Sequence, residues 1–259
     1  MATILGRALS PFTNEPIKTY RDRGERGAMH AALRSLKQEF GRTYPLVIDG
    51  ERIATDKTIR SINPGNPDEL VGTVASASLE QATRAIDVAN RAFETWKKTS
   101  AAERAECLFR AAALVRERRY EYNAMLVYEV GKSWIEADGD TAEAIDFLEY
   151  YAREALRYDR AGSVTPIPGE ENELRYVPLG VGVVIPPWNF AFAIMAGMTC
   201  AAIVTGNTVV LKPSSDSPII AARFIDLLHE AGVPPGVVNF VPGSGGTIGD
   251  AIVAHPLTR

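Results

Sequence analysis

The sequence has little cysteine and little histidine. Its 259 residues include two cysteines and three histidines. Two cysteines are too few for a disulfide framework and are typical of a reducing compartment, so we expect a cytoplasmic protein. The histidines, His30, His229 and His255, lack the spacing of metal ligands. No metal site is therefore predicted.

A strong charge of one sign and a long apolar run are also absent. The net charge is −4, and no basic stripe is present, which argues against nucleic-acid binding. The most apolar stretch, residues 181–211, is interrupted by prolines, asparagines and a glycine, so it predicts buried strands and a helix instead of a membrane span. The first residues carry no apolar run with a cleavage site, and we expect no secretory signal.

What is present is typical of a globular protein with one large domain, or one domain with an appendage: 46% of the residues are hydrophobic and 23% charged. Residues 29–40 show a weak helical periodicity. Asp49-Gly50, between two short apolar runs, predicts a tight β-hairpin, and another strand is expected near 71–75. Helices are expected from the capping box at Ser78, from the capping box at Ser100 to about Gly131, and over 141–157.

Strands and helices alternate in the second half of the chain. Strands are expected within 180–187, 207–213 and 237–243, and helices up to Ala202, from Ser217 to Gly232 and over 246–256. This order predicts an α/β fold, a Rossmann-like parallel sheet with flanking helices. Right-handed crossovers place a ligand crevice at the carboxyl ends of the strands. The chain ends where a further strand is expected, which would leave an open apolar edge.

Three strand ends carry candidate chemistry. The first leads through two prolines to Trp188 and Asn189, whose amide can donate to a negative oxygen, although packing and a turn would explain the same residues. The second ends in Lys212, which could reach ribose hydroxyls or phosphate or could be an ordinary surface lysine. The third enters the glycine run 243–249, which permits close backbone approach to a ligand but is a weak signal alone.

In combination these segments, PWNF, NTVVLKPS and HEAGVPPGVVNFVPGSG, resemble the aldehyde dehydrogenase superfamily from about Asp49 to the end of the chain. Further upstream, TYPLVIDGE, LVYEVGKSWIEAD, TAEAIDFLEYYAREALRYDR and PGEENELRYVPLGVGVVIPPWNF are similar to its L-glutamate-γ-semialdehyde (1-pyrroline-5-carboxylate) dehydrogenase branch. Such enzymes oxidise L-glutamate γ-semialdehyde to L-glutamate in proline degradation, with NAD or NADP as acceptor.

The resemblance implies roles for matching residues. Asn189 would stabilise the oxyanion of the reaction intermediates. The cofactor would be bound by Ile185, Pro187, Trp188, Lys212, Ser214, Ser215, Gly245 and Gly249, with Lys212 on the adenosine ribose. Glu143 and Phe190 would lie near the aldehyde tunnel.

The resemblance also implies a domain organisation. Residues 1–45 would be an amino-terminal helical and extended segment, and 46–161 with 180–259 an incomplete NAD(P)-binding domain. Residues 162–179 would belong to a β-hairpin used for oligomerisation, and the catalytic domain would be absent. We expect a homo-oligomer at full length.

The cofactor preference depends on Ser215, which stands where many relatives carry an acidic residue. A carboxylate there would accept a hydrogen bond from the ribose 2′-hydroxyl and repel a 2′-phosphate. Serine removes that repulsion, so we expect some use of NADP beside NAD.

The family's reaction needs a cysteine thiolate and a glutamate base, and both are expected beyond Arg259. Cys107, within a helical stripe, and Cys200, in an apolar stretch, are expected to be buried and unreactive. We therefore expect this chain alone to be inactive and prone to aggregate. Two alternatives remain open: a dehydrogenase for another aldehyde, and a non-catalytic, dinucleotide-binding truncated product.

Overall fold

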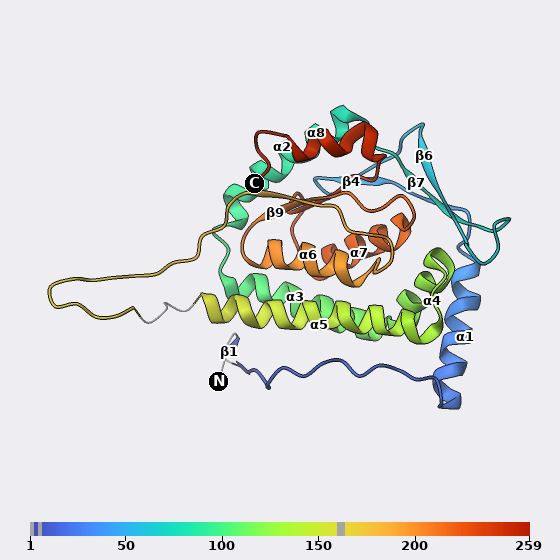
Figure 1. The fold of residues 1–259 in the computed structure, drawn as a ribbon, viewed down its shortest axis with the longest axis horizontal. Coiled ribbons are helices and arrows are strands. Elements are labelled where there is room, and N and C mark those ends of the chain that lie inside the picture. The colour runs from blue at the N-terminus through green and yellow to red at the C-terminus, as the bar shows by residue number, and fades with distance from the viewer. Residues whose placement is uncertain (1–2, 5–6, 160–163) are drawn as a thin grey trace.

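The computed structural model describes residues 3–4, 7–159 and 164–259. A central sheet is covered by helices on both faces (Figure 1). Helices α2 (Leu79–Trp96) and α8 (Asp250–Val253) lie on one face. Helices α6 (Ala193–Val204) and α7 (Pro218–Glu230) lie on the other, and α3 (Ala101–Glu117) and α5 (Trp134–Tyr158) form a further layer outside them.

The central sheet confirms the expected parallel strands and adds an antiparallel pair. Its order is β5-β4-β10-β9-β8, in which β8 (Val181–Val184), β9 (Thr208–Leu211) and β10 (Val238–Phe240) run parallel. The predicted hairpin, β4 (Leu46–Ile48) and β5 (Glu51–Ile53), joins this sheet because β4 pairs antiparallel with β10. The sheet is thus mixed.

The backbone conformation of that hairpin turn explains why aspartate and glycine occupy it. Asp49 and Gly50 have φ angles of 58° and 76°, so both lie in the left-handed region. Two such residues in succession form the turn whose twist suits a two-residue hairpin, and aspartate followed by glycine is a preferred pair for it.

A smaller sheet lies at one end of the molecule and includes the strand expected near 71–75. Its order is β3-β7-β6, formed by Arg42–Tyr44, Leu70–Ala75 and Thr58–Ile62. Helix α1 (Arg23–Lys37) packs against α4 (Arg119–Val130). A two-stranded ribbon, β1 (Thr3–Ile4) with β2 (Arg7–Ala8), lies near the amino terminus.

The helices differ from expectation in two places. Both predicted capping boxes are present, but the helix expected from Ser100 to Gly131 is two helices, because Arg118 leaves helical geometry with φ −101° and ψ 20°. Gly131 does end the second of them, α4, in the left-handed conformation. Helix α5 begins at Trp134, earlier than the expected Thr141, since Ser133 and Glu136 form a third capping box.

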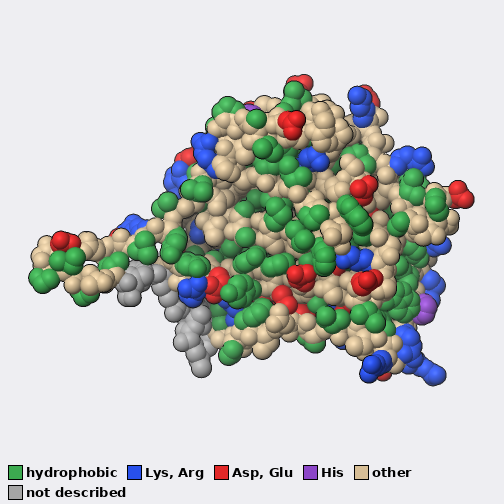
Figure 2. All heavy atoms as spheres, in the orientation of Figure 1, with side chains coloured by type: hydrophobic (Ala, Val, Ile, Leu, Met, Phe, Trp, Pro, Cys, Tyr) green, Lys and Arg blue, Asp and Glu red, His purple; other side chains and the backbone are tan. Residues whose placement is uncertain are grey.

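The segment predicted to be an oligomerisation hairpin extends away from the body (Figure 1). It reverses at a turn in which the Glu170 amide donates to the Ile167 carbonyl at 3.0 Å. No strand is formed within residues 164–179, and residues 162–163 lie outside the described part of the chain. Its apolar side chains are open to solvent, with Val177 and Leu179 72% and 71% exposed (Figure 2).

The last residues pair with the outer side of β8, where the sequence predicts a further strand. Thr258 forms a parallel bridge with Val181, and the Arg259 amide donates to the Val181 carbonyl at 3.0 Å. Among the helices that the structure describes, none is long and apolar enough to cross a membrane.

Candidate functional site

The register of the parallel strands brings the three predicted site segments to one edge of the sheet. Val184 pairs with Leu211, and Leu211 pairs with Phe240, so the three strands end side by side. The segments that begin at Ile185, Lys212 and Val241 therefore leave the sheet together. This convergence confirms that the three segments meet at one edge of the sheet, where the sequence predicts a ligand site.

The first segment presents its side chains to solvent. Ile185, Trp188 and Phe190 are 41%, 53% and 42% exposed, and Asn189 is also exposed. Asn189 lies in the turn that leads into α6. Exposed aromatic and aliphatic side chains beside a free carboxamide indicate a binding surface more than a packed corner.

The second segment carries a lysine that is not at the surface. Lys212 is only 6% exposed, and its Nζ lies 3.4 Å from the Pro213 carbonyl oxygen. No carboxylate pairs with it among the described residues, and burial lowers its pKa. The surface-lysine alternative is thus wrong. A buried ammonium with one weak acceptor has hydrogen bonds left for a ligand.

The two serines after Lys212 have different environments. The Ser214 hydroxyl accepts a hydrogen bond from the Asp216 amide at 3.2 Å, so it supports the local turn. Ser215 is exposed and shares a pocket of about 530 Å³ with Trp188 and Asp216. The structure thereby joins residues of the first and second segments in one cavity, and Asp216 is a member that the sequence analysis missed.

The third segment is open where a ligand would approach. A Cβ built on Gly245 or Gly249 would meet no atom within 4 Å, whereas one on Gly243 would lie 2.6 Å from Ile248 Cδ1. Packing within the protein explains the glycine at 243 but not those at 245 and 249. Those two are consistent with space kept free for a bound group.

A missed ion pair lies beside the predicted aldehyde-side residues. Lys132 Nζ is 4.6 Å from the centre of the Phe190 ring and 2.9 Å from Asp140 Oδ2. Glu143, one turn after Asp140 on α5, has its pKa raised by burial and by the charge of Asp140. Lys132 and Asp140 both stand in LVYEVGKSWIEAD and its continuation, but neither their burial nor their contact could be read from the spacing.

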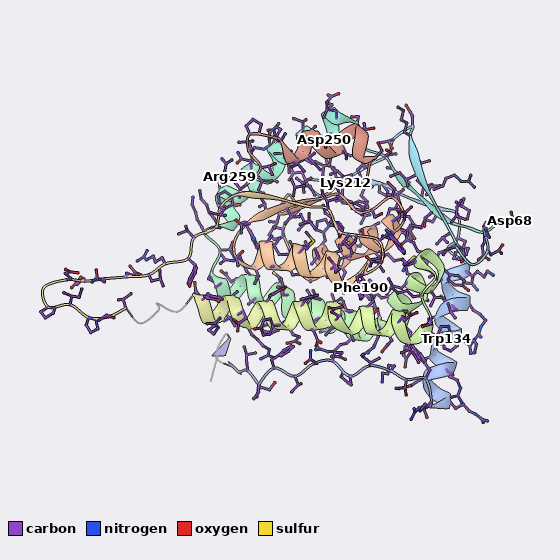
Figure 3. The ribbon with its side chains drawn as sticks, viewed as in Figure 1. Asp68, Trp134, Phe190, Lys212, Asp250 and Arg259 are labelled. Carbon is purple, nitrogen blue, oxygen red and sulfur yellow. The ribbon has the colours of Figure 1, made fainter. Side chains whose placement is uncertain are left out.

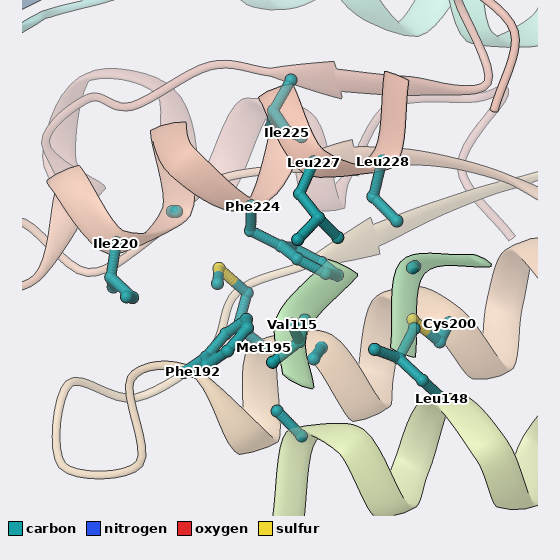
Figure 4. Close-up of a cluster of buried hydrophobic side chains, with 14 of the residues drawn as sticks. Val115, Leu148, Phe192, Met195, Cys200, Ile220, Phe224, Ile225, Leu227 and Leu228 are labelled. Atoms are coloured by element: carbon teal, nitrogen blue, oxygen red, sulfur yellow. The ribbon is translucent and has the colours of Figure 1, made fainter. Parts of the chain in front are cut away.

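Neither cysteine is a nucleophile at this site. Cys200 lies in the helix-layer core with Leu148 and Phe224 nearby (Figure 4), and full burial strongly raises the pKa of its thiol. Cys107 is 5% exposed, and burial raises its pKa although Arg110 lies 3.3 Å away. No cluster of metal-ligating side chains occurs in the part of the chain that the structure describes.

Comparison with known proteins identifies the family. Residues 52–259 match the model of the Aldehyde dehydrogenase family. The chain belongs to this family. It is 54% identical over 251 residues to the 1-pyrroline-5-carboxylate dehydrogenase of Geobacillus kaustophilus, and the match covers 97% of this chain and 49% of that protein. The enzyme of the same name from Bacillus pumilus is 56% identical over 249 residues, which cover 96% of this chain and 48% of that protein.

A solved structure supports the same family at the level of the fold. The structure of 1-pyrroline-5-carboxylate dehydrogenase from Thermus with bound NAD has a TM-score of 0.94 and 51% identity, covering 97% of this chain and 49% of that one. The chain spans about half the length of these relatives. The fold class inferred from the sequence, the family and its branch are therefore confirmed.

Proposed function

We propose that this chain forms the cofactor-binding part of a dehydrogenase that oxidises L-glutamate γ-semialdehyde, in equilibrium with 1-pyrroline-5-carboxylate, to L-glutamate in proline degradation. The observation that carries the proposal is the meeting of three matching segments at one sheet edge, in a chain 54% identical to an enzyme of that name. At this edge the chain binds a dinucleotide and presents a carboxamide to the reacting aldehyde.

The residues at the edge fit NAD. Lys212, with its unused hydrogen bonds, holds the ribose hydroxyls, and the open backbone at Gly245 and Gly249 admits the adenine and pyrophosphate. Ile185, Pro187 and Trp188 line the nicotinamide side, with Ser214 and Ser215 beside the adenosine ribose. Bound NAD supplies the hydride acceptor. Because Ser215 carries no charge, NADP is a second acceptor.

Asn189 is the residue of this chain that acts on the substrate. Its side-chain amide donates to the aldehyde oxygen as negative charge develops there, which lowers the barrier to attack by a thiolate. Glu143 and Phe190 lie on the aldehyde side. The thiolate and the glutamate that activates water are not supplied by Cys107, Cys200 or the other residues described, and the family pattern places them beyond Arg259. The proposal therefore implies that the chain by itself is inactive.

The proposed organisation follows the predicted boundaries. Residues 1–45 form a segment that leads into the domain, 46–161 and 180–259 form the dinucleotide-binding unit, and 162–179 belong to an oligomerisation hairpin. The exposed Tyr176, Val177 and Leu179 support this last assignment, because such side chains gain stability when a neighbouring subunit covers them. We place the homo-oligomer in the cytoplasm.

The test is an assay of the protein that contains this chain together with a carboxyl-terminal catalytic half. With 1-pyrroline-5-carboxylate and NAD we expect NADH to form, and to form faster than with unrelated aliphatic aldehydes. If the protein oxidises another aldehyde faster, the proposed substrate is wrong but the proposed reaction, oxidation of an aldehyde with NAD, stands. If NAD binds and no aldehyde is oxidised, the chain belongs to a non-catalytic dinucleotide-binding protein.

A further inference from the structure

A buried carboxylate lies behind the segment that carries Asn189. Asp140, on α5, is 2% exposed and accepts a hydrogen bond from the Ala193 amide at 2.7 Å through Oδ1. Ala193 is the first residue of α6, whose opening amides have no partner within the helix. The cap residue, Phe192, supplies no side-chain hydrogen bond. Asp140 thus acts as a cap from another helix.

The second oxygen of the Asp140 carboxylate holds the Lys132 ammonium against the segment that carries Asn189. Asp140 Oδ2 lies 2.9 Å from Lys132 Nζ, and that ammonium stands 4.6 Å from the centre of the Phe190 ring. The segment is held further by Phe192, which lies in the buried cluster of Figure 4. Its ring stacks on that of Tyr122, with the ring centres 4.6 Å apart. Figure 3 shows where Phe190 lies, at the approach to α6.

We propose that Asp140, with Lys132, is a positioning residue that sets the turn on which Asn189 is presented. This rests on the proposed function, because the turn matters only where Asn189 meets a reacting oxygen. Asn189 is exposed, so burial of its own side chain does not fix its position. The turn is therefore restrained from its two ends, by β8 before it and by Asp140, Lys132 and Phe192 behind it. An oxyanion donor must be in place before the reaction begins, since its value lies in preorganisation.

The chain contains a matched control two residues away. Asp138 is also fully buried on α5 and also pairs with a cation, through Arg119 Nη2 at 2.6 Å. It accepts a backbone amide too, from Lys18 at 2.5 Å. Asp138 therefore holds the amino-terminal segment, whereas Asp140 holds the start of α6.

Asparagine is the informative replacement at both positions. Each aspartate receives donors on both oxygens, so an asparagine must turn its NH2 group toward one of them. In Asp140→Asn a donor then faces either the Ala193 amide or the Lys132 ammonium. In Asp138→Asn the donor faces Arg119 in either orientation, because Arg119 donates to both oxygens, and in one orientation it also faces the Lys18 amide. The two variants remove similar charges but disturb different segments.

Hydrogen–deuterium exchange in the protein that contains this chain and its catalytic half tests the proposal without reference to activity. We expect Asp140→Asn to increase exchange in residues 186–196 and to leave residues 10–20 unchanged. Asp138→Asn should give the reverse pattern. Lys132→Met, which keeps Asp140, should loosen 186–196 as well. Unchanged exchange in 186–196 for Asp140→Asn would overturn the proposal.

Steady-state kinetics of the same proteins provide the second readout. We expect Asp140→Asn to lower kcat by about 10-fold or more, since misplacement of a reacting group by 1 Å can cost about 100-fold. The KM for NAD should change less than about twofold, because Lys212 and the glycine run are untouched. An equal fall in kcat for Asp138→Asn would indicate general destabilisation and contradict the proposal. A wild-type protein without activity would instead refute the proposed function, and the exchange result would still decide the positioning role.

Discussion

At the scale of single residues, we propose that one side chain of this chain, that of Asn189, acts on the substrate. Asn189→Ala removes the donor to the developing oxyanion, and a lost oxyanion donor typically lowers kcat by about 10²–10³. We expect that loss in the protein that contains the catalytic half, with NAD binding retained. Stopped-flow or steady-state NADH formation measures it. A variant with wild-type kcat would show that Asn189 is only part of a turn.

We propose that cofactor preference is also decided at a single position, Ser215. Ser215→Glu places a carboxylate in the pocket shared with Trp188, where it can accept from a ribose 2′-hydroxyl and repel a 2′-phosphate. We expect kcat/KM for NADP to fall by about 10-fold or more, equal to about 1.4 kcal/mol, while that for NAD is kept or improved. The matched control is Ser215→Gln, which adds a side chain of the same size at the same position without the charge. Equal losses with both cofactors in Ser215→Glu would contradict this assignment.

At the scale of elements, the beginning of α7 is held by a second buried carboxylate. The sequence predicts Ser217 as its N-cap and Pro218 as its first residue, and Pro218 is confirmed, but Ser217 makes no capping hydrogen bond. Glu129 on α4 accepts from the Ile219 and Ile220 amides at 2.7 and 2.8 Å instead. A cap supplied by a distant helix leaves no local sequence signal, which is why it was not predicted.

This cap makes stability depend on pH. Burial raises the pKa of Glu129 from its ordinary 4.5 to about 7 in the folded protein. Between these values the folded state binds more protons than the unfolded state, so stability falls as pH rises through the interval. Glu129→Gln removes the ionisation. We expect thermal melts of the variant to change less across the interval than those of the wild type, and parallel curves would refute the assignment.

Some elements could be predicted from the sequence, and others could not. Capping boxes at Ser78 and Ser100 and the Asp49-Gly50 turn were identified because each depends on residues adjacent in the chain. The break at Arg118 was missed because no glycine, proline or side-chain cap marks it in the sequence. The antiparallel pairing of β4 with β10 joins residues far apart in sequence, and no local pattern encodes it. The same holds for the contact between Lys132 and Asp140.

At the scale of the whole molecule, we propose that the protruding segment meets a neighbouring subunit. Val177→Asp with Leu179→Asp places charge on side chains that are more than two-thirds exposed in the chain, at 72% and 71%. We expect the oligomer of the protein containing this chain to dissociate to a smaller species in sedimentation velocity. Val253→Asp, at a site 57% exposed on α8, is the matched control. An unchanged oligomer in the double variant would remove the oligomerisation role from this segment.

The central proposal for the whole molecule is that this edge of the sheet is a dinucleotide site. Sequence reasoning located that edge because strand ends in a parallel sheet converge, and the structure places Val184, Leu211 and Phe240 in register. It could not reveal that Lys212 is buried or that Gly245 and Gly249 face open space, since both depend on the packed fold.

The most direct test is calorimetric titration of NAD into the protein that contains this chain, for the wild type and for Lys212→Met, followed by assay with 1-pyrroline-5-carboxylate. The central prediction is that the wild type binds NAD and forms NADH, and that Lys212→Met binds NAD at least about 10-fold more weakly. That loss of about 1.4 kcal/mol or more is close to the lower end of the range for one hydrogen bond to a charged group, about 1.5–3 kcal/mol. NAD affinity unchanged in Lys212→Met, or a wild type that binds no NAD, would contradict it.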